Sequence, residues 1–332
     1  MKFCFKNISV LGDGGWGTTL AILLHRKGCK VTLWSAFEDY ARLLDKMRTN
    51  PNYLKGVKIP VGIKITSDLK QALKADLVVV AAPSQYLRSV LLKGKPCYDK
   101  NIPVVSVVKG IDNISLSRMS EIIKDVWKTR HICVLSGPTI AQEVARGIPT
   151  TAVASSKYRP LMLAVQDLFM TPYFRIYSNP DIAGVELGGS LKNIIAIACG
   201  ISDGLGFGTN AKAAIVSRGL AEMSRLGRVM GASKETFSGI SGLGDLVTTC
   251  FNPLSRNHFV GYKIARGMSL KQVAGHMKMV AEGVPTARSA YRLARKYRVD
   301  TPLMDEIYRV LFKNKSPLSA VGHLMMREKK SE

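Results

Sequence analysis

Residues 7–34 read NISVLGDGGWGTTLAILLHRKGCKVTLW, and this stretch decides the fold of the first half of the chain. The apolar run at 7–11 is rich in β-branched residues and predicts a strand, which a cluster of glycines follows at once. Residues 18–26 have a composition that favours a helix, Gly28 is placed to end it, and 30–34 predict a second strand. Strand, tight turn, helix and strand in this order form a βαβ unit.

The turn between the first strand and the helix carries the pattern G-x-G-x-x-G at Gly12, Gly14 and Gly17. The pattern is weak alone, but here it follows a predicted strand and opens a predicted helix, which is the context it requires. The three glycines allow a tight turn, close approach of the backbone to a pyrophosphate, and close helix–strand packing. N–H groups of Gly15 and Trp16 at the helix start can then bind phosphate oxygens. We therefore expect all five residues to bind a dinucleotide.

The end of the second strand bears on which dinucleotide binds. NAD-specific sites usually place Asp or Glu there, bonded to the ribose 2′-hydroxyl. This chain has the neutral Ser35, and Glu38 and Asp39 follow too late. A missing carboxylate removes a charge that would repel a 2′-phosphate, although no arginine stands in the turn to bind one. We expect Ser35 to contact NAD or NADP, with a preference for NADPH.

Short apolar runs without periodicity continue the alternation of strands and helices, as is typical of strands buried on both faces. A short helix is predicted at 68–73, and further strands at 76–82, 103–108, 131–135, 151–154 and 174–177. This order predicts an α/β, Rossmann-like domain with a parallel, doubly wound sheet.

From Glu186 onward the sequence predicts helices and no strand. The segments that suit helices are 190–198, 211–226, 255–266, 287–296 and 304–313. We therefore expect an all-α C-terminal domain at 189–332, after a nucleotide-binding domain at 1–188.

Of the 332 residues, 48 are Lys or Arg and 24 are Asp or Glu, which gives a formal net charge of +24. Such a charge draws in anions. A phosphate-bearing substrate and cofactor, nucleic acid, an acidic membrane surface, or simply a solvated basic surface remain alternatives. The basic residues are spread along the chain rather than gathered in one tail, which argues against a dedicated nucleic-acid arm.

The six cysteines are scattered and form no CxxC pair, which predicts reduced thiols in a cytoplasmic protein and no metal site. The apolar stretch at 8–11 is too short for a signal peptide. We find no run of the roughly 18 apolar residues that a membrane span needs. The sequence therefore predicts a soluble protein without membrane insertion.

Several later segments carry side chains typical of a site. Lys109, in Val-Val-Lys-Gly, and the segment Ser-Gly-Pro-Thr at 136–139 each follow a predicted strand, at the edge where open α/β sheets bind ligands. In the second half stand Glu-Leu-Gly-Gly-Ser-Leu-Lys-Asn at 186–193, Ser-Gly-Leu-Gly-Asp at 241–245 and Asn-Pro-Leu-Ser-Arg-Asn at 252–257.

With these segments, the glycine loop and Ala-Glu-Gly at 281–283, the chain resembles the bacterial NAD(P)-dependent glycerol-3-phosphate dehydrogenase family over residues 7–315. The segments occur in the family's order, and together they are highly specific. Departures are small: Thr139 stands where many members have serine, and Asp13 and Gly15 vary the first loop.

The resemblance implies reduction of dihydroxyacetone phosphate to sn-glycerol 3-phosphate, which supplies phospholipid synthesis. Lys192 would donate the proton in reduction and accept it in oxidation. A lysine can do this only where burial or nearby positive charge lowers its pKa. Lys109 would stabilise the oxyanion or the substrate phosphate and contact the cofactor, and Asp245 would orient Lys192 and bind a substrate hydroxyl.

The resemblance also implies the remaining contacts. The substrate would be bound by Gly137 and Thr139 and by a phosphate clamp of Ser255, Arg256 and Asn257. The cofactor would be contacted by Ala141, Arg256, Val280 and Glu282. A homodimer is expected at the level of the family. Two rivals remain: a related reductase of hydroxy or sugar acids, whose carboxylate Arg256 could bind, and a protein that binds nucleic acid without turnover.

Overall fold

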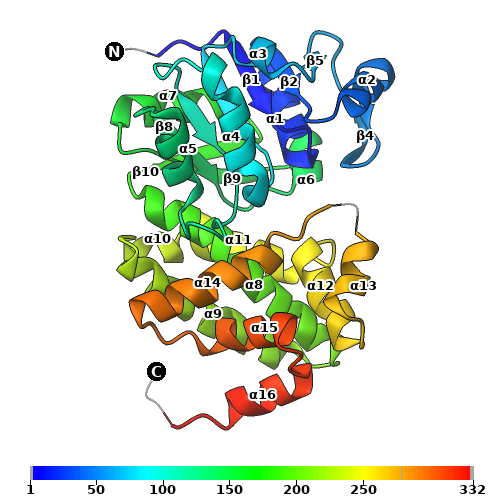
Figure 1. Ribbon diagram of the computed structural model, residues 1–332, viewed down its shortest axis with the longest axis vertical. Coiled ribbons are helices and arrows are strands. Elements are labelled where there is room, and N and C mark those ends of the chain that lie inside the picture. The colour runs from blue at the N-terminus through cyan, green and yellow to red at the C-terminus, as the bar shows by residue number, and fades with distance from the viewer. Residues whose placement is uncertain (1–2, 278, 330–332) are drawn as a thin grey trace. The chain divides into compact units, whose positions relative to one another are not determined.

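The computed structural model describes residues 3–277 and 279–329, which fold into two compact units (Figure 1). The first unit comprises the residues up to 109 together with 117–186, and the second comprises 110–116 and the residues from 187 onward. The expected boundary at 188 therefore differs from the division of the units by two residues. The segment 110–116, which the sequence placed in the first domain, belongs to the second unit. There, for example, Ser289 Oγ lies 3.1 Å from the carbonyl oxygen of Ile111.

The first unit alternates strands and helices. Its elements are β1 (Asn7–Leu11), α1 (Gly15–Arg26), β2 (Lys30–Trp34), α2 (Glu38–Met47), β3 (Thr49–Asn50), β4 (Leu54–Lys58), β5 (Lys64–Thr66), α3 (Leu69–Ala72), β6 (Leu77–Val80), η1 (Ser84–Tyr86), α4 (Leu87–Gly94), η2 (Lys95–Cys97), β7 (Val104–Ser106), α5 (Met119–Trp127), β8 (Ile132–Ser136), α6 (Ala141–Ala145), β9 (Thr150–Ser155), α7 (Arg159–Phe169) and β10 (Phe174–Asn179). Every strand expected from the sequence is present. The hairpin β3–β4, strand β5, helices α2, α4, α5, α6 and α7, and the 3-10 helices η1 and η2 are additional.

Eight strands form one sheet in the order β10-β9-β8-β7-β6-β1-β2-β5. The neighbouring pairs are parallel except β8–β9, which is antiparallel, so the expected parallel, doubly wound sheet is confirmed apart from this one pair. β8 and β9 are joined by residues 137–149, whose one helix is the five-residue α6. After this connection β9 runs back alongside β8.

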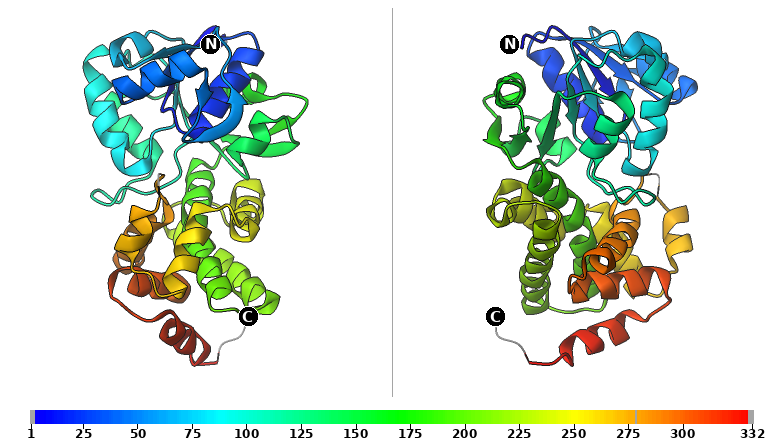
Figure 2. Two further views of the ribbon diagram at one scale, coloured as in Figure 1. Left: turned by 90° about the vertical axis from the view of Figure 1, so that its right-hand side faces the viewer. Right: turned by 60° about the vertical axis from the view of Figure 1, so that its left-hand side comes forward.

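Helices cover both faces of this sheet, as the two views of Figure 2 show. Alternate residues of β6 point to opposite faces, with Leu77 and Val79 in one apolar cluster and Val78 and Val80 in another. The first cluster contains side chains of α1, α6 and α7, and the second contains side chains of α3, α4 and α5. Burial on both faces explains why the strand sequences lack a polar alternation.

From residue 187 onward, the described residues of the second unit form helices joined by loops, with no strand. Its elements are the main part of α8 (Ile182–Gly204), then α9 (Thr209–Val229), α10 (Lys234–Ser238), the π-helix η3 (Ile240–Gly244), α11 (Asp245–Phe251), α12 (Arg256–Ala265), α13 (Leu270–Gly275), α14 (Gly283–Tyr297), α15 (Pro302–Phe312) and α16 (Pro317–Met325). The expected all-α domain is thus confirmed. Helices α10, α11, α13 and α16 were not expected from the sequence.

Helix α8 is the core helix of the second unit. By length and composition this helix could cross a membrane. The sequence analysis expected no such segment, but the apolar residues continue on both sides of Glu186 and Lys192. Yet 89% of its apolar window is buried inside the protein, and Leu191 and Ile194 lie in the apolar core. Its hydrophobicity therefore reflects burial by the surrounding helices.

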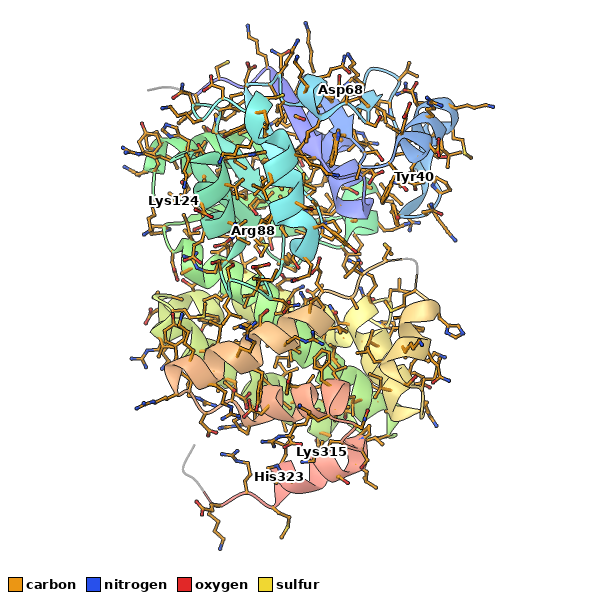
Figure 3. All side chains as sticks on the ribbon, in the orientation of Figure 1. Tyr40, Asp68, Arg88, Lys124, Lys315 and His323 are labelled. Carbon is orange, nitrogen blue, oxygen red and sulfur yellow. The ribbon has the colours of Figure 1, made fainter. Side chains whose placement is uncertain are left out.

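Buried carboxylates connect helices of the second unit. Glu306 of α15 is 1% exposed and pairs with Lys315 at 2.6 Å and His323 at 2.8 Å, the two residues labelled near the C-terminus in Figure 3. Glu222 of α9 accepts hydrogen bonds from the backbone N–H groups of Leu303 (2.8 Å) and Met304 (3.0 Å). It thereby caps the N-terminus of α15, where the first N–H groups have no partner within the helix. Burial raises the pKa of Glu222 to about 7, although these two hydrogen bonds act against the shift.

This capping carboxylate predicts a pH-dependent stability. An unfolded glutamate titrates near pH 4.5 and Glu222 in the fold near pH 7, so the folded state binds more protons between these values and its stability falls as pH rises through them. Glu222→Gln removes this titration. We expect the unfolding free energy of the variant, relative to the wild type, to rise by about 2 to 3 kcal/mol between pH 5 and 8, at about 1.4 kcal/mol per pKa unit.

Urea unfolding followed by circular dichroism at several pH values measures this difference. Glu235→Gln, at an exposed position of α10, is the matched control and should show a difference that is flat over the same range. A constant offset added to this rise is compatible with the prediction, whereas a difference between Glu222→Gln and the wild type that does not change with pH would contradict it.

Candidate functional site

The glycine loop at the start of α1 has the geometry of a phosphate cradle. Gly12 has a φ of +125°, and a Cβ there would lie 2.7 Å from the carbonyl oxygen of Ala81. A Cβ at Gly17 would lie 1.9 Å from the carbonyl oxygen of Gly12, so α1 packs directly on the loop. At Gly14, the N-cap of α1, a Cβ would meet no described atom within 4 Å, which leaves the backbone open to a ligand. The loop therefore fits a dinucleotide pyrophosphate at the helix N-terminus.

Two further residues expected at the cofactor stand beside this loop. The hydroxyl of Thr19 lies 2.8 Å from the carbonyl oxygen of Gly15 and 3.1 Å from that of Ala141. Ala141 opens α6, so the starts of α1 and α6 are held together. Trp16 directs its indole into the core, edge-on to Phe174 with ring centroids 6.2 Å apart, and only its backbone is placed at the helix start.

Ser35 is fully buried immediately after β2, where it holds a carboxylate that the sequence did not place there. Its Oγ donates to Asp13 Oδ2 at 2.6 Å, with the carbonyl oxygen of Phe37 as a second possible acceptor at 3.1 Å. Burial raises the pKa of Asp13, and the Ser35 hydrogen bond opposes that shift. The premise of the NADPH expectation, a strand end without a carboxylate, is therefore wrong.

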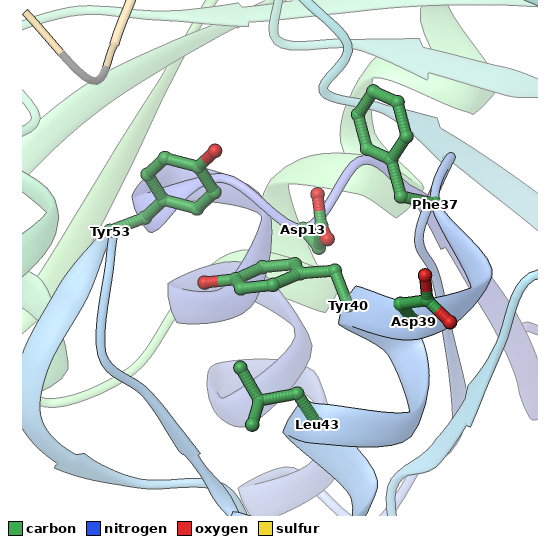
Figure 4. A pocket seen from close by; sticks show the side chains of 6 residues that line it. All are labelled: Asp13, Phe37, Asp39, Tyr40, Leu43 and Tyr53. Atoms are coloured by element: carbon green, nitrogen blue, oxygen red, sulfur yellow. The ribbon is translucent and has the colours of Figure 1, made fainter.

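A hollow of about 420 Å³ opens beside Asp13 (Figure 4). Its lining residues are Asp13, Phe37, Asp39, Tyr40, Leu43 and Tyr53. The buried Asn50 joins two of these residues: its Nδ2 donates to the carbonyl oxygen of Asp13 at 2.7 Å, and its Oδ1 accepts from the Tyr40 hydroxyl at 2.7 Å. Aromatic walls beside a carboxylate are suited to a base and its ribose.

Lys109, Gly137 and Thr139 are brought together at the carboxyl ends of the neighbouring strands β7 and β8. Lys109 Nζ donates to the carbonyl oxygen of Gly137 at 2.8 Å and lies 3.5 Å from Thr139 Oγ1. Lys109 is also the last residue before the chain enters the second unit. Three residues expected at the substrate therefore share one edge of the sheet.

In the second unit, Lys192 forms a buried ion pair. It is 6% exposed, and its Nζ donates to Asp245 Oδ1 at 2.5 Å and to Thr249 Oγ1 at 2.5 Å. Thr249 in turn donates to the backbone oxygen of Asp245 at 2.6 Å. Asp245 and Thr249 are four residues apart on α11 and so share one helix face. An amine fixed in this way on two sides is positioned to exchange a proton with a bound molecule.

The segment expected to clamp phosphate forms the start of α12. Ser255 is its N-cap and accepts from the backbone N–H of His258 at 3.4 Å. Arg256 is exposed and donates to the carbonyl oxygen of Val280 at 2.8 Å. Glu282 stands close to that carbonyl in sequence, at the N-cap of α14.

Asn257 is mainly a connector. Its Nδ2 donates to Asn193 Oδ1 at 2.8 Å, and its Oδ1 accepts from the N–H of Gly283 at 2.9 Å. It is buried and joins α8, α12 and α14. The sequence missed Thr249, although its spacing of four from Asp245 was a usable signal, and missed Asp13, whose place beside Ser35 no local pattern reveals.

Comparison with known proteins agrees with these features. The family models for the N-terminus and the C-terminus of NAD-dependent glycerol-3-phosphate dehydrogenase match residues 7–161 and 181–322. A glycerol-3-phosphate dehydrogenase [NAD(P)+] of Pelotomaculum thermopropionicum is 49% identical over 329 residues, covering 98% of this chain and 94% of the relative. The crystal structure of glycerol-3-phosphate dehydrogenase from Coxiella burnetii has a TM-score of 0.94 at 36% identity, covering 97% and 99% of the two chains.

A more distant reductase shares the architecture. A ketopantoate reductase of the PanE/ApbA family from Ralstonia eutropha has a TM-score of 0.63 at 13% identity, covering 92% of this chain and 97% of its own. At that identity the likeness shows the fold alone, whereas the closer relatives match in sequence over nearly the full length. The chain therefore belongs to the NAD-dependent glycerol-3-phosphate dehydrogenase family.

Proposed function

We propose that this chain catalyses the reversible reduction of dihydroxyacetone phosphate to sn-glycerol 3-phosphate with NADH or NADPH. The observation that carries the proposal is the buried Lys192, held by Asp245 and Thr249 in a chain of this family. The glycine loop of the first unit fits the cofactor pyrophosphate. The product would supply glycerophospholipid synthesis, which the resemblance to the family supports.

The bound reduced nicotinamide supplies a hydride to the carbonyl carbon of the substrate. Negative charge then develops on the carbonyl oxygen, and Lys192 Nζ donates a proton to it. In the reverse direction the neutral amine accepts the hydroxyl proton. Asp245 and Thr249 fix the amine throughout, so the proton is delivered from a defined position.

The phosphate and the oxyanion need cationic and N–H partners. Ser255, Arg256 and Asn257 at the start of α12 offer a guanidinium and the N–H groups of a helix N-terminus, a combination suited to phosphate. Lys109, Gly137 and Thr139 offer an ammonium, a backbone and a hydroxyl at one sheet edge. We assign both sets to the substrate, and Ala141, Val280 and Glu282 to the cofactor, by their match to the family.

The physical state follows the family as well. We propose a soluble, cytoplasmic homodimer that binds small molecules and neither nucleic acid nor a membrane interior. The apolar helix α8 is consistent with this, because most of its surface is buried. Light scattering after size exclusion should give twice the mass of 36.3 kDa, and a monomer would contradict the dimer.

Replacing Lys192 tests the proposed chemistry. Lys192→Met removes the amine, and Lys192→Arg keeps the positive charge in a group that does not release its proton. Both should lower kcat for dihydroxyacetone phosphate by about 10²- to 10⁴-fold, the usual contribution of proton transfer. Following NADH absorbance measures turnover, and titration with NADH shows whether each variant still binds cofactor.

Lys212→Met is the matched control, because Lys212 also pairs with an aspartate of the second unit, Asp203, at 2.7 Å. It should retain kcat within a few-fold. Turnover of Lys192→Arg close to that of the wild type would remove Lys192 from proton transfer. Faster reduction of hydroxy-acid precursors than of dihydroxyacetone phosphate would remove the substrate assignment.

The position of Lys192 depends on how closely α8 approaches η3. A Cβ on Gly188, one turn before Lys192, would lie 2.6 Å from the backbone oxygen of Ser241, which is one turn before Asp245. Residues four apart lie on the same helix face, so the closest approach and the ion pair are on the same side of both segments.

Gly188→Ala should therefore separate the lysine from its aspartate. The backbone of α8 or η3 has to move to admit the new methyl group, at a cost of about 1–3 kcal/mol in stability. A misplacement of the Lys192 amine by about 1 Å can lower the rate by about 10²-fold. We expect kcat to fall by about 10- to 100-fold with NADH affinity retained. Gly322→Ala in α16, where a Cβ meets no described atom within 4 Å, should leave kcat unchanged. Equal kcat values for the two variants would contradict the positioning role.

A further inference from the structure

The end of β2 and the glycine loop form one continuous edge. The N–H of Gly12 donates to the carbonyl oxygen of Trp34, the last residue of β2, at 3.0 Å. Asp13 and Ser35 follow these two residues directly and are joined at 2.6 Å. A loop residue thus places its carboxylate where NAD-specific folds place the acidic residue that ends the second strand.

Asp13 is held at both its side chain and its backbone. Ser35 holds the side chain, and the backbone oxygen of Asp13 accepts from Asn50 Nδ2 at 2.7 Å and from Thr18 Oγ1 at 3.1 Å. Asn50 is fully buried, so this arrangement is part of the core rather than a mobile surface contact. The carboxyl group therefore has a fixed direction relative to the loop.

The position also fits the chemistry of the ligand. Gly12 and Gly14, on either side of Asp13, form the pyrophosphate cradle. In a dinucleotide the adenosine ribose is joined to the pyrophosphate through its 5′ carbon, so its hydroxyls lie about one sugar ring from the cradle. Asp13 lines the hollow of Figure 4, where those hydroxyls would be placed.

The charge of the hollow distinguishes the two nicotinamide dinucleotides. Its six lining residues include two carboxylates, Asp13 and Asp39, and no lysine or arginine. A ribose with free 2′- and 3′-hydroxyls can donate hydrogen bonds to a carboxylate. A 2′-phosphate would instead bring negative charge against it with no lining cation to neutralise that charge, and juxtaposed like charges are unfavourable.

We propose that Asp13, held by Ser35, binds the adenosine ribose hydroxyls and makes this chain prefer NADH to NADPH. The proposal rests on the proposed function for the identity of the cofactor. It replaces the preference for NADPH expected from the residues that follow β2. Asp13 is a specificity-determining residue and Ser35 is its positioning residue.

Binding measured without substrate tests the proposal. Isothermal titration of the wild type should give a Kd for NADPH about tenfold or more above that for NADH, because like charges meet in the hollow. Asp13→Asn removes the charge at constant shape, so the ratio of the two Kd values should approach one, with weaker NADH and tighter NADPH binding. Ser35→Ala keeps the carboxylate charge but removes the hydrogen bond that positions it, and should reduce the Kd ratio in part.

Asp39→Asn is the matched control. It removes one negative charge from the same hollow at an exposed position of α2, and should change the ratio less than Asp13→Asn does. Tighter binding of NADPH by the wild type would overturn the proposal. A loss of affinity in Asp13→Asn that is equal for NADH and NADPH would also overturn it. So would a change in the Kd ratio in Asp39→Asn as large as the change in Asp13→Asn. Should Asp13→Asn fail to fold by circular dichroism, the wild-type ratio and the Ser35→Ala variant decide.

A parallel assay of dihydroxyacetone phosphate reduction separates this proposal from the proposed function. Tight, selective NADH binding without turnover would leave Asp13 in its role and overturn the reaction. Turnover that is faster with NADPH, together with tighter NADPH binding, would leave the reaction in place and overturn the role of Asp13.

Discussion

The buried pair of Lys192 and Asp245 is the constraint around which the second unit is organised. Removing two charges from water is costly, and such pairs often add little net stability compared with apolar side chains of similar size. The surrounding structure nevertheless keeps them in contact: Thr249 bonds to both, and the absent side chain of Gly188 lets η3 lie against α8. A pair that is costly to bury and so closely confined is better explained by chemistry than by stability.

In the proposed function, anion recognition in both units relies on backbone N–H groups as much as on charge. α1 begins at Gly15 with no side-chain cap, which leaves its first N–H groups to a ligand, whereas α12 begins behind the cap residue Ser255. Helix N-termini bind anions through N–H groups and the helix dipole without a specific cation. A net charge of +24 produces a longer-range field that would raise the local concentration of phosphorylated molecules.

Much of the fold could be predicted because its signals are local. β1, α1 and β2 are contiguous and separated by glycines, and strands buried on both faces produce apolar runs that are hard to mistake. The meeting of Lys109 with Gly137 was also predictable, because the carboxyl ends of neighbouring parallel strands share one edge. The reversed β9, the hairpin β3–β4 and the packing of 110–116 with the second unit depend on contacts between distant segments, which no local pattern reports.

The same distinction explains why the sequence did not place Asp13 at the end of the second strand. Sequence rules assign the charge at the end of the second strand to the residues that follow it, and those residues are Ser35 and its neighbours. In the fold, residues of the glycine loop also lie at that position. The hydrogen bond from Gly12 to Trp34 joins the loop to the strand end and brings Asp13 next to Ser35. A bound dinucleotide would meet the carboxylate at the end of β2, whichever segment of the chain supplies it. A rule about the second strand should therefore be applied also to the loop that its last carbonyl anchors, and here that loop carries Asp13, between Gly12 and Gly14.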